Sequence, residues 1–300
     1  MFGGFRNNEV TIETREENGE KTVINFRIET FGDVTVEVYY PPKDKVNLSC
    51  PPLLMVHGMF GGGWYFYDWA IFLCKKGMKI YVIRDMHQGD DLSKTDFYTY
   101  LKKAINLAER IYIQETKNII VLGHSMGGLI TQKIAERFGS DFIAGIVLVA
   151  SAPPKGISAM SCSVVKAMLK HLPSLVFNLP LKIDKKSTFK LILNWLGDDE
   201  RKEQIFEKFV PESSRVAKQL AFSKIPVDHK KIVCKSLVVA GLYDKLLPHR
   251  IQIKIANKYD ADFLSFLKGH MMMLENKRED EIINGIYRWM SLNFICESNS

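Results

Sequence analysis

The stretch that decides the fold is Asn118–Gly128, which reads NIIVLGHSMGG. Its first half is a dense apolar run, typical of a strand buried in a parallel sheet, and its second half begins a helix. The junction, Gly123–Gly127, spells G-x-S-x-G. A serine on such a tight turn projects its hydroxyl above the sheet, while the flanking glycines let strand and helix approach closely. The stretch therefore predicts a strand–turn–helix unit with Ser125 as the candidate nucleophile. An ordinary N-cap serine at a glycine-rich helix start is the alternative.

Strands and helices alternate on both sides of this unit. A polar–apolar alternation over residues 9–41, interrupted by turn signals, predicts an antiparallel meander. Buried strands are expected at Leu53–Val56, Lys79–Arg84, Asn118–Leu122, Ala144–Ala150, Ser236–Ala240 and Phe263–Leu267. Helices are expected at Trp64–Lys75, Lys94–Glu109, Gly127–Phe138, Pro248–Lys258 and Glu279–Leu292. This order predicts the α/β class, with a mostly parallel, doubly wound sheet.

The strand–helix rhythm breaks between Pro153 and about Asp228. Here prolines separate helical patterns at Ser158–Leu172, Thr188–Trp195, Glu200–Phe209 and Ser213–Phe222. A helical insertion between two sheet strands predicts a lid over the carboxyl edge of the sheet, where such folds bind ligands. We therefore expect a first part of the core over residues 1–153, a helical lid over 154–230, a second part of the core over 231–295 and a flexible tail over 296–300.

Composition is that of an ordinary globular protein, with 46% hydrophobic and 25% charged residues and a net charge of +7. The basic residues are spread among 34 acidic ones without an arginine-rich block, so we expect no nucleic-acid partner. The charge still allows weak contact with a lipid surface. No apolar run approaches the ~20 residues of a membrane span. The first residues are polar and acidic after position 5, unlike a secretory signal.

The cysteines indicate a reducing compartment. Cys50, Cys74, Cys162, Cys234 and Cys296 are scattered and form no C-x-x-C pair. We therefore expect reduced thiols in a cytoplasmic protein, and neither a metal nor a cofactor. The glycines at 61–63 lack the spacing of a phosphate-binding loop. Nothing in these patterns predicts an oligomeric state.

A serine hydroxyl is a poor nucleophile at neutral pH and needs a general base that an acid orients. Of the seven histidines, His270 lies in a loop after the last expected strand, from which it can reach back over the sheet. Asp244 leaves the Ser236–Ala240 strand in a turn. The chain order Ser125, Asp244, His270 predicts a catalytic triad. Asp85 also ends a strand but precedes the serine, and we interpret it as a structural turn residue.

An oxyanion hole is expected in the loop that ends LLMVHGMFGGG at Leu53–Gly63. A backbone N–H in this loop can point at the carbonyl oxygen that becomes negative, and the residue after the nucleophile supplies a second N–H. We therefore nominate the amides of Met59 and Met126. For His57 and His124, which belong to these two loops, we expect structural hydrogen bonds rather than proton transfer.

Four motifs together resemble the α/β-hydrolase family, specifically its lidded serine esterases and lipases. They are VHG at 56–58, GHSMGG at 123–128, GLYDKLLP at 241–248 and GH at 269–270. The resemblance implies Ser125 as nucleophile, Asp244 as acid and His270 as base, with the Met59 and Met126 amides as the oxyanion hole. It also implies that residues 151–154 and the lid line the acyl pocket.

One turn departs from that family. Many relatives carry a D-x-R-G-H-G-type turn, whereas this chain has DMHQGDD at 85–91. We expect this turn to lie away from the acyl chemistry.

The function that these features predict is hydrolysis of a carboxylic ester, of the apolar acyl or small-lipid type, through an acyl-serine intermediate. Acyl transfer, aminopeptidase cleavage and C–C bond hydrolysis on the same triad are alternatives. An aminopeptidase would need lid carboxylates, and Asp198, Asp199 and Glu200 are available but have the pattern of a solvated helix start. A non-catalytic hydrolase-fold binding protein is a further alternative, against which the intact Ser, Asp and His argue.

Overall fold

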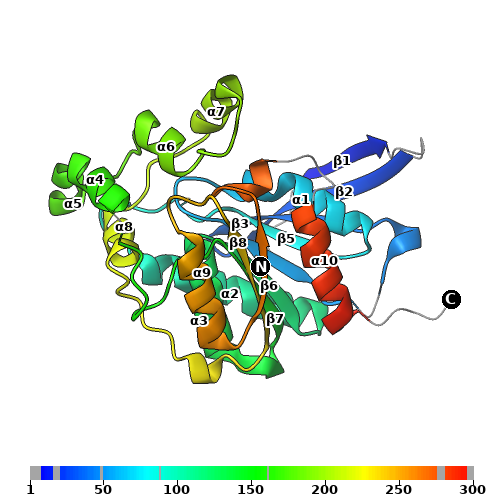
Figure 1. The fold of residues 1–300 in the computed structure, drawn as a ribbon. Coiled ribbons are helices and arrows are strands. Elements are labelled where there is room, and N and C mark those ends of the chain that lie inside the picture. The colour runs from blue at the N-terminus through cyan, green and yellow to red at the C-terminus, as the bar shows by residue number, and fades with distance from the viewer. Residues whose placement is uncertain are drawn as a thin grey trace.

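A nine-stranded sheet forms the centre of the protein (Figure 1). The computed structural model describes residues 8–15, 21–47, 50–87, 89–160, 162–275 and 281–295. Its strands are β1 (Asn8–Arg15), β2 (Lys21–Phe31), β3 (Val34–Tyr40), β4 (Leu53–Val56), β5 (Ile80–Asp85), β6 (Ile119–His124), β7 (Ile143–Val149), β8 (Lys235–Gly241) and β9 (Asp262–Phe266). They lie in the order β1-β2-β3-β5-β4-β6-β7-β8-β9. β1, β2, β3 and β5 pair antiparallel, and the pairs from β5 to β9 are parallel.

Helices cover both faces of the sheet. α2 (Phe97–Glu115), α3 (Met126–Phe138) and α9 (His249–Tyr259) pack on one face, and α1 (Tyr67–Lys75) and α10 (Glu281–Phe294) on the other. Every residue of β4 and β6 is buried, as the dense apolar runs predict for strands covered on both sides. The α/β class and the mostly parallel sheet are therefore confirmed.

The chain between β7 and β8 forms a cap of helices. These are α4 (Cys162–Lys170), α5 (Leu172–Phe177), α6 (Lys185–Leu191), α7 (Asp199–Phe206) and α8 (Ser214–Ala221). Leu181 and Glu212 pair as an antiparallel bridge, each amide donating to the other's carbonyl, at 2.7 and 2.9 Å. The bridge closes residues 182–211, which carry α6 and α7, into an excursion from the rest of the cap (Figure 1).

Two helices of the cap differ from the sequence-based prediction. The helix predicted over Ser158–Leu172 is two helices, α4 and α5, which break at His171. Pro173 lies at the start of α5, where its missing N–H costs nothing, but it cannot continue α4. The helix predicted from Thr188 starts earlier because the Asp184 side chain accepts from the Ser187 amide at 3.0 Å and caps it.

Over the part of the chain that the structure describes, no helix combines the length and apolar character needed to cross a bilayer. The tail predicted at 296–300 lies outside the described residues.

Candidate active site

Ser125 occupies a strained turn between β6 and α3. Its φ of 54° and ψ of −117° are rare for a residue with a side chain. The Ser125 carbonyl accepts from the amides of Gly128 at 3.0 Å and Ala152 at 2.9 Å, which hold the turn in place. A Cβ on Gly127 would collide with the carbonyl oxygen of Val56 in the neighbouring strand. The glycine of the motif is therefore what allows the helix to begin so close to the sheet.

His270 and Asp244 meet at the carboxyl edge of the sheet, after β9 and β8. His270 Nδ1 lies 2.8 Å from Asp244 Oδ2, and both side chains are buried. Asp244 Oδ1 accepts from the amides of Leu246 and Leu247, each at 2.8 Å. A carboxylate only accepts, so His270 Nδ1 donates, and in the neutral ring Nε2 then carries the lone pair. The two side chains that the sequence nominated as acid and base are therefore hydrogen-bonded to each other.

A cavity between the sheet edge and the cap joins Ser125 to His270, since both residues line it. Ala152 and Pro153 also line it, whereas Ser151 and Pro154 do not, although all four were expected to. The cap contributes mainly apolar side chains, among them Met168, Leu175, Leu181, Leu191, Phe209 and Leu220. Such a cavity suits a ligand with an apolar part beside a polar group at Ser125.

The loop after β4 lies against the serine. A Cβ added to Gly58 would lie 3.0 Å from the Ser125 Cβ, which is tighter than most side-chain contacts, so a glycine favours this close approach. The next two residues are Met59 and Phe60, and both line the cavity. The Phe60 carbonyl accepts from the amide of Val210 in the cap at 2.8 Å. The loop that carries the Met59 amide is therefore anchored to the cap.

His124, directly before Ser125, is a buried neutral residue. Its Nε2 lies 3.0 Å from the carbonyl oxygen of His270, so this nitrogen donates to the His270 backbone. Burial, together with the nearby imidazole of His270, lowers the pKa of His124 well below its ordinary value. These contacts give His124 a structural role in the loop of His270.

His57, at the start of the Met59 loop, is neutral as well. Its Nε2 accepts from the amide of Met86 at 3.1 Å, and its Nδ1 donates to the carbonyl of Gly58 at 2.8 Å. Burial and the neighbouring charge of His87 lower the pKa of His57 to about 4. Both ring nitrogens are occupied by backbone groups, so His57 fixes the loop and has no nitrogen left for proton transfer.

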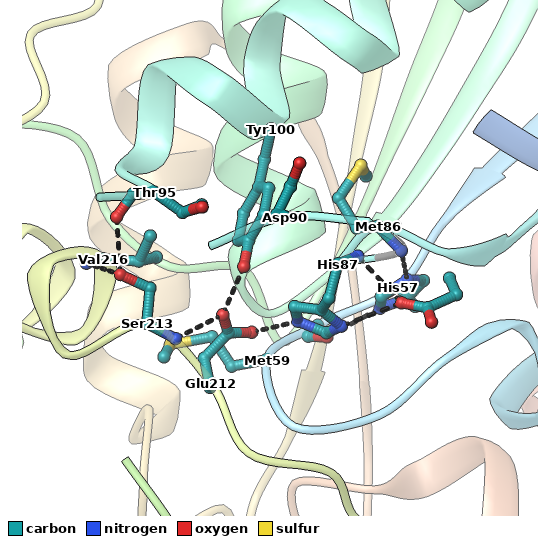
Figure 2. A network of polar contacts seen from close by, with 12 residues as sticks. His57, Met59, Met86, His87, Asp90, Thr95, Tyr100, Glu212, Ser213 and Val216 are labelled. Carbon is teal, nitrogen blue, oxygen red and sulfur yellow. Dashed lines mark hydrogen bonds and ion pairs between the residues drawn. The ribbon is translucent and has the colours of Figure 1, made fainter. Parts of the chain in front are cut away.

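A buried polar network, absent from the sequence-based expectations, joins the cap to the turn after β5 (Figure 2). Glu212 of the cap is fully buried. Its Oε1 accepts from the Tyr100 hydroxyl at 2.5 Å and the Ser213 amide at 2.7 Å, and its Oε2 contacts Nε2 of His87. His87 Nδ1 lies 3.0 Å from Asp85 Oδ1. Since both imidazole nitrogens face carboxylates, both donate and the ring carries a positive charge.

The pKa of His87 follows from these neighbours. Burial opposes the charge, but the hydrogen bonds and negative charges of Asp85 and Glu212 outweigh it and raise the pKa to about 9. The centres of the His87 and His57 rings lie 5.9 Å apart. The turn at 85–91, which we expected to lie away from the acyl chemistry, therefore contacts the base of the Met59 loop. The unusual DMHQGDD sequence was the one signal of this network.

Glu275 supports the backbone beside His270. Both of its carboxylate oxygens accept from the amide of Gly269, at 3.2 and 3.0 Å. Burial raises the pKa of Glu275 to about 7. No group of three or more His, Cys, Asp or Glu side chains within the described ranges is arranged to hold a metal ion.

Comparison with known proteins gives one family. The sequence pattern of the Alpha/beta hydrolase family matches residues 53–282. The "Carbendazim hydrolyzing esterase" of Nocardioides sp. (strain SG-4G) is 29% identical over 114 residues, which are 36% of this chain and 45% of that protein. "Salicylic acid-binding protein 2" of Nicotiana tabacum is 29% identical over 104 residues, 33% of this chain and 39% of that protein. Both matches thus span less than half the length of the curated relative.

A solved structure shares the whole fold. The thermophilic esterase from Thermogutta terrifontis superposes with a TM-score of 0.62 over 96% of this chain and 99% of that chain, at 17% sequence identity. At this identity the likeness concerns the fold alone.

Proposed function

The chain belongs to the alpha/beta hydrolase family, and on that premise we propose that it is a serine hydrolase that cleaves carboxylic esters through an acyl-serine intermediate. One observation carries the proposal: Ser125 and His270 line the same cavity, and Nδ1 of His270 lies 2.8 Å from the Asp244 carboxylate. Acyl transfer needs a nucleophile, a base and an orienting acid, and these observations support Ser125, His270 and Asp244 in those roles. The name of the Nocardioides relative, an esterase, also supports ester hydrolysis.

In the proposed mechanism, Asp244 keeps the proton of His270 on Nδ1, so that Nε2 can take the proton of the Ser125 hydroxyl. The Ser125 Oγ then attacks the ester carbonyl carbon, and the carbonyl oxygen becomes an oxyanion. The amides of Met59 and Met126 would donate to it. His270 returns the proton to the leaving alkoxide as the tetrahedral intermediate collapses to the acyl-serine. A water that gives its proton to His270 attacks this ester, and the acid product leaves as Ser125 regains its proton.

The substrate class follows from the cavity lining. Its wall between the cap and the core is mainly aliphatic and aromatic, so an apolar acyl chain gains most from entering it. Among the described residues that line the cavity there is no Asp or Glu, which leaves a substrate ammonium group without a partner. Asp198, Asp199 and Glu200 instead lie exposed at the start of α7. An apolar ester is therefore favoured over an aminopeptidase substrate.

The test combines covalent labelling with a series of p-nitrophenyl esters of increasing acyl length. We expect a fluorophosphonate to label Ser125, located by mass spectrometry, and Ser125→Ala to lower kcat on the order of 10⁶-fold, the loss reported for another serine hydrolase. Turnover of the esters should rise with chain length until the cavity is filled. A folded protein that neither reacts with the label nor hydrolyses any ester would instead be a binding protein.

A further inference from the structure

The outer face of α4 and α5 carries a cluster of exposed apolar side chains. Among the described residues, 21 large apolar side chains are exposed, and six of these fall between positions 165 and 179. We call them the outer apolar patch: Val165, Leu169, Leu172, Val176, Phe177 and Leu179. Phe177 is 71% exposed and Leu169 62%. Isolated exposed apolar residues are common, whereas six of them within fifteen positions favour an interaction surface.

Lysines lie within and directly after the segment that carries the outer apolar patch. Residues 165–190 contain six lysines and one aspartate. All six are exposed: Lys166, Lys170, Lys182, Lys185, Lys186 and Lys190. Lys166 and Lys170 each follow a patch residue on α4, so they lie on the flank of the same helical stripe. The single aspartate, Asp184, lies near Lys170 at 3.3 Å and caps α6. The segment that carries the patch, residues 165–180, therefore contains two lysines and no acidic residue, whereas Lys185 on α6 pairs with Glu203 of α7.

This combination selects one kind of partner. A second copy of the chain would bring two lysine-rich surfaces together, and like charges at an interface are repulsive. An anionic lipid surface instead offers phosphates to the lysines and acyl chains to the apolar side chains. The acidic start of α7, which such a surface would repel, lies on a different part of the cap from α4 and α5 (Figure 1).

The inner side of the same segment belongs to the cavity. Met168 of α4, His171 between the helices and Leu175 of α5 all line it, together with Ser125. One layer of helix, about 10 Å across, therefore separates the outer apolar patch from the cavity. A surface that binds lipid on one side and encloses the nucleophile on the other is suited to a substrate that resides in the membrane.

We propose that the outer apolar patch docks this protein on membrane surfaces that contain anionic lipids. α4 and α5 lie in the plane of the interface, with the patch among the acyl chains and the lysines at the phosphates. The proposal rests on the proposed ester hydrolysis only for its purpose, the delivery of a lipid ester to Ser125. Docking itself needs no catalysis, so the two can fail separately.

Co-sedimentation with vesicles tests the docking. The full chain, carrying Ser125→Ala to keep the lipids intact, is mixed with vesicles of phosphatidylcholine alone or with added phosphatidylglycerol. We expect binding to the anionic vesicles, weakened by high salt. Leu169→Ser with Phe177→Ser should lower the partition coefficient roughly tenfold or more, because two apolar side chains no longer enter the acyl region. Leu292→Ser is the matched control, since Leu292 is 79% exposed on α10, away from the cap.

Three outcomes overturn the docking proposal. Absence of vesicle binding does so directly, and so does binding that the double variant leaves unchanged, because the lysines alone would then explain it. Self-association in analytical ultracentrifugation that the double variant abolishes, without vesicle binding, would assign the patch to a second copy. In the Ser125 background, the double variant should hydrolyse a soluble p-nitrophenyl ester normally, which shows that it is folded. Vesicle binding in a protein without any esterase activity would contradict the proposed function and leave the docking intact.

Discussion

Asp244 gives one carboxylate oxygen to two backbone amides and the other to His270, and this division makes its amide variant informative. In Asp244→Asn, the side-chain oxygen is expected to stay with the amides of Leu246 and Leu247, because only an oxygen can accept from them. The NH₂ group then faces His270 Nδ1, which must accept, so the ring proton moves to Nε2. We expect kcat to fall about 10⁴-fold, which is the loss reported for the same change in a protease. The melting temperature should stay unchanged.

The matched control for this variant is Asp85→Asn. Asp85 also ends a strand of the sheet, but its side chain contacts His87 and lies outside the cavity lining. Its replacement should leave kcat within a few-fold of the parent, whereas a larger loss than in Asp244→Asn would transfer the role of acid to Asp85.

Gly127 tests how much of the serine turn depends on backbone contact. A methyl group in Gly127→Ala meets the carbonyl oxygen of Val56, which is fixed in the sheet and cannot move aside. We expect a loss of about 3 kcal/mol in the free energy of unfolding, the upper end for overpacking, measured by urea denaturation. Gly197→Ala is the control, because a Cβ there has no neighbour within 4 Å. Equal stability of the two variants would contradict this account of the motif.

At the residue scale, sequence predicted what is local. The strained turn at Ser125 was predictable because five consecutive residues encode it. The meeting of Asp244 and His270 was predictable because each follows a strand that ends at the same edge of the sheet. Glu212 was not, because its partner His87 is 125 positions away and its neighbourhood has the pattern of an ordinary loop. A long-range buried pair leaves no periodic signal in either segment.

At the scale of elements, the sheet was predicted more accurately than the cap. Buried parallel strands are short apolar runs, and each strand ends where the apolar residues give way to polar turn residues. The cap helices are short, and a few local hydrogen bonds fix their ends, such as the Asp184 side chain on the Ser187 amide. Proline at the start of α5 could be interpreted either as the end of one helix or as the first turn of the next. Pattern alone does not choose between them.

Glu212 links the cap to the core through its buried contacts with His87 and Tyr100, and its charge can be removed without changing its shape. Glu212→Gln leaves the imidazolium of His87 without a buried counter-charge, so we expect it to lower the free energy of unfolding by about 3 kcal/mol. Chemical denaturation measures this loss. In a double-mutant cycle, adding His87→Gln should cost little more, because the pair is already broken.

Glu203→Gln provides the comparison within the same cap. Glu203 pairs with Lys185 at the surface, where ion pairs contribute about 0–1 kcal/mol. If Glu212→Gln proves no more destabilising than Glu203→Gln, the buried network does not hold the cap.

For the whole molecule, the network predicts a stability that falls at alkaline pH. The pKa of His87 rises from 6.5 to about 9 on folding, so its contribution is complete below pH 6.5 and is lost as pH rises through 9. The pKa of Glu275 rises from 4.5 to about 7 on folding, so its contribution to stability is complete below pH 4.5 and is lost as pH rises through 7, which is below the window of His87. We therefore expect the melting temperature to decline between pH 7 and 9.5. His87→Gln should flatten this decline, and an unchanged slope in that variant would assign it to other groups.

The bridge between Leu181 and Glu212 gives the cap an interchangeable part. It holds the two ends of residues 182–211 one strand spacing apart. This excursion, the cassette, is therefore joined to the rest of the molecule at two neighbouring points. Ile183 and Phe209, near the two ends of this excursion, line the cavity. Ser125 and Glu212 are not part of residues 182–211. Exchange of the cassette for one of different length or side chains should therefore alter which acyl groups are accepted, while the nucleophile turn and the buried network keep their places.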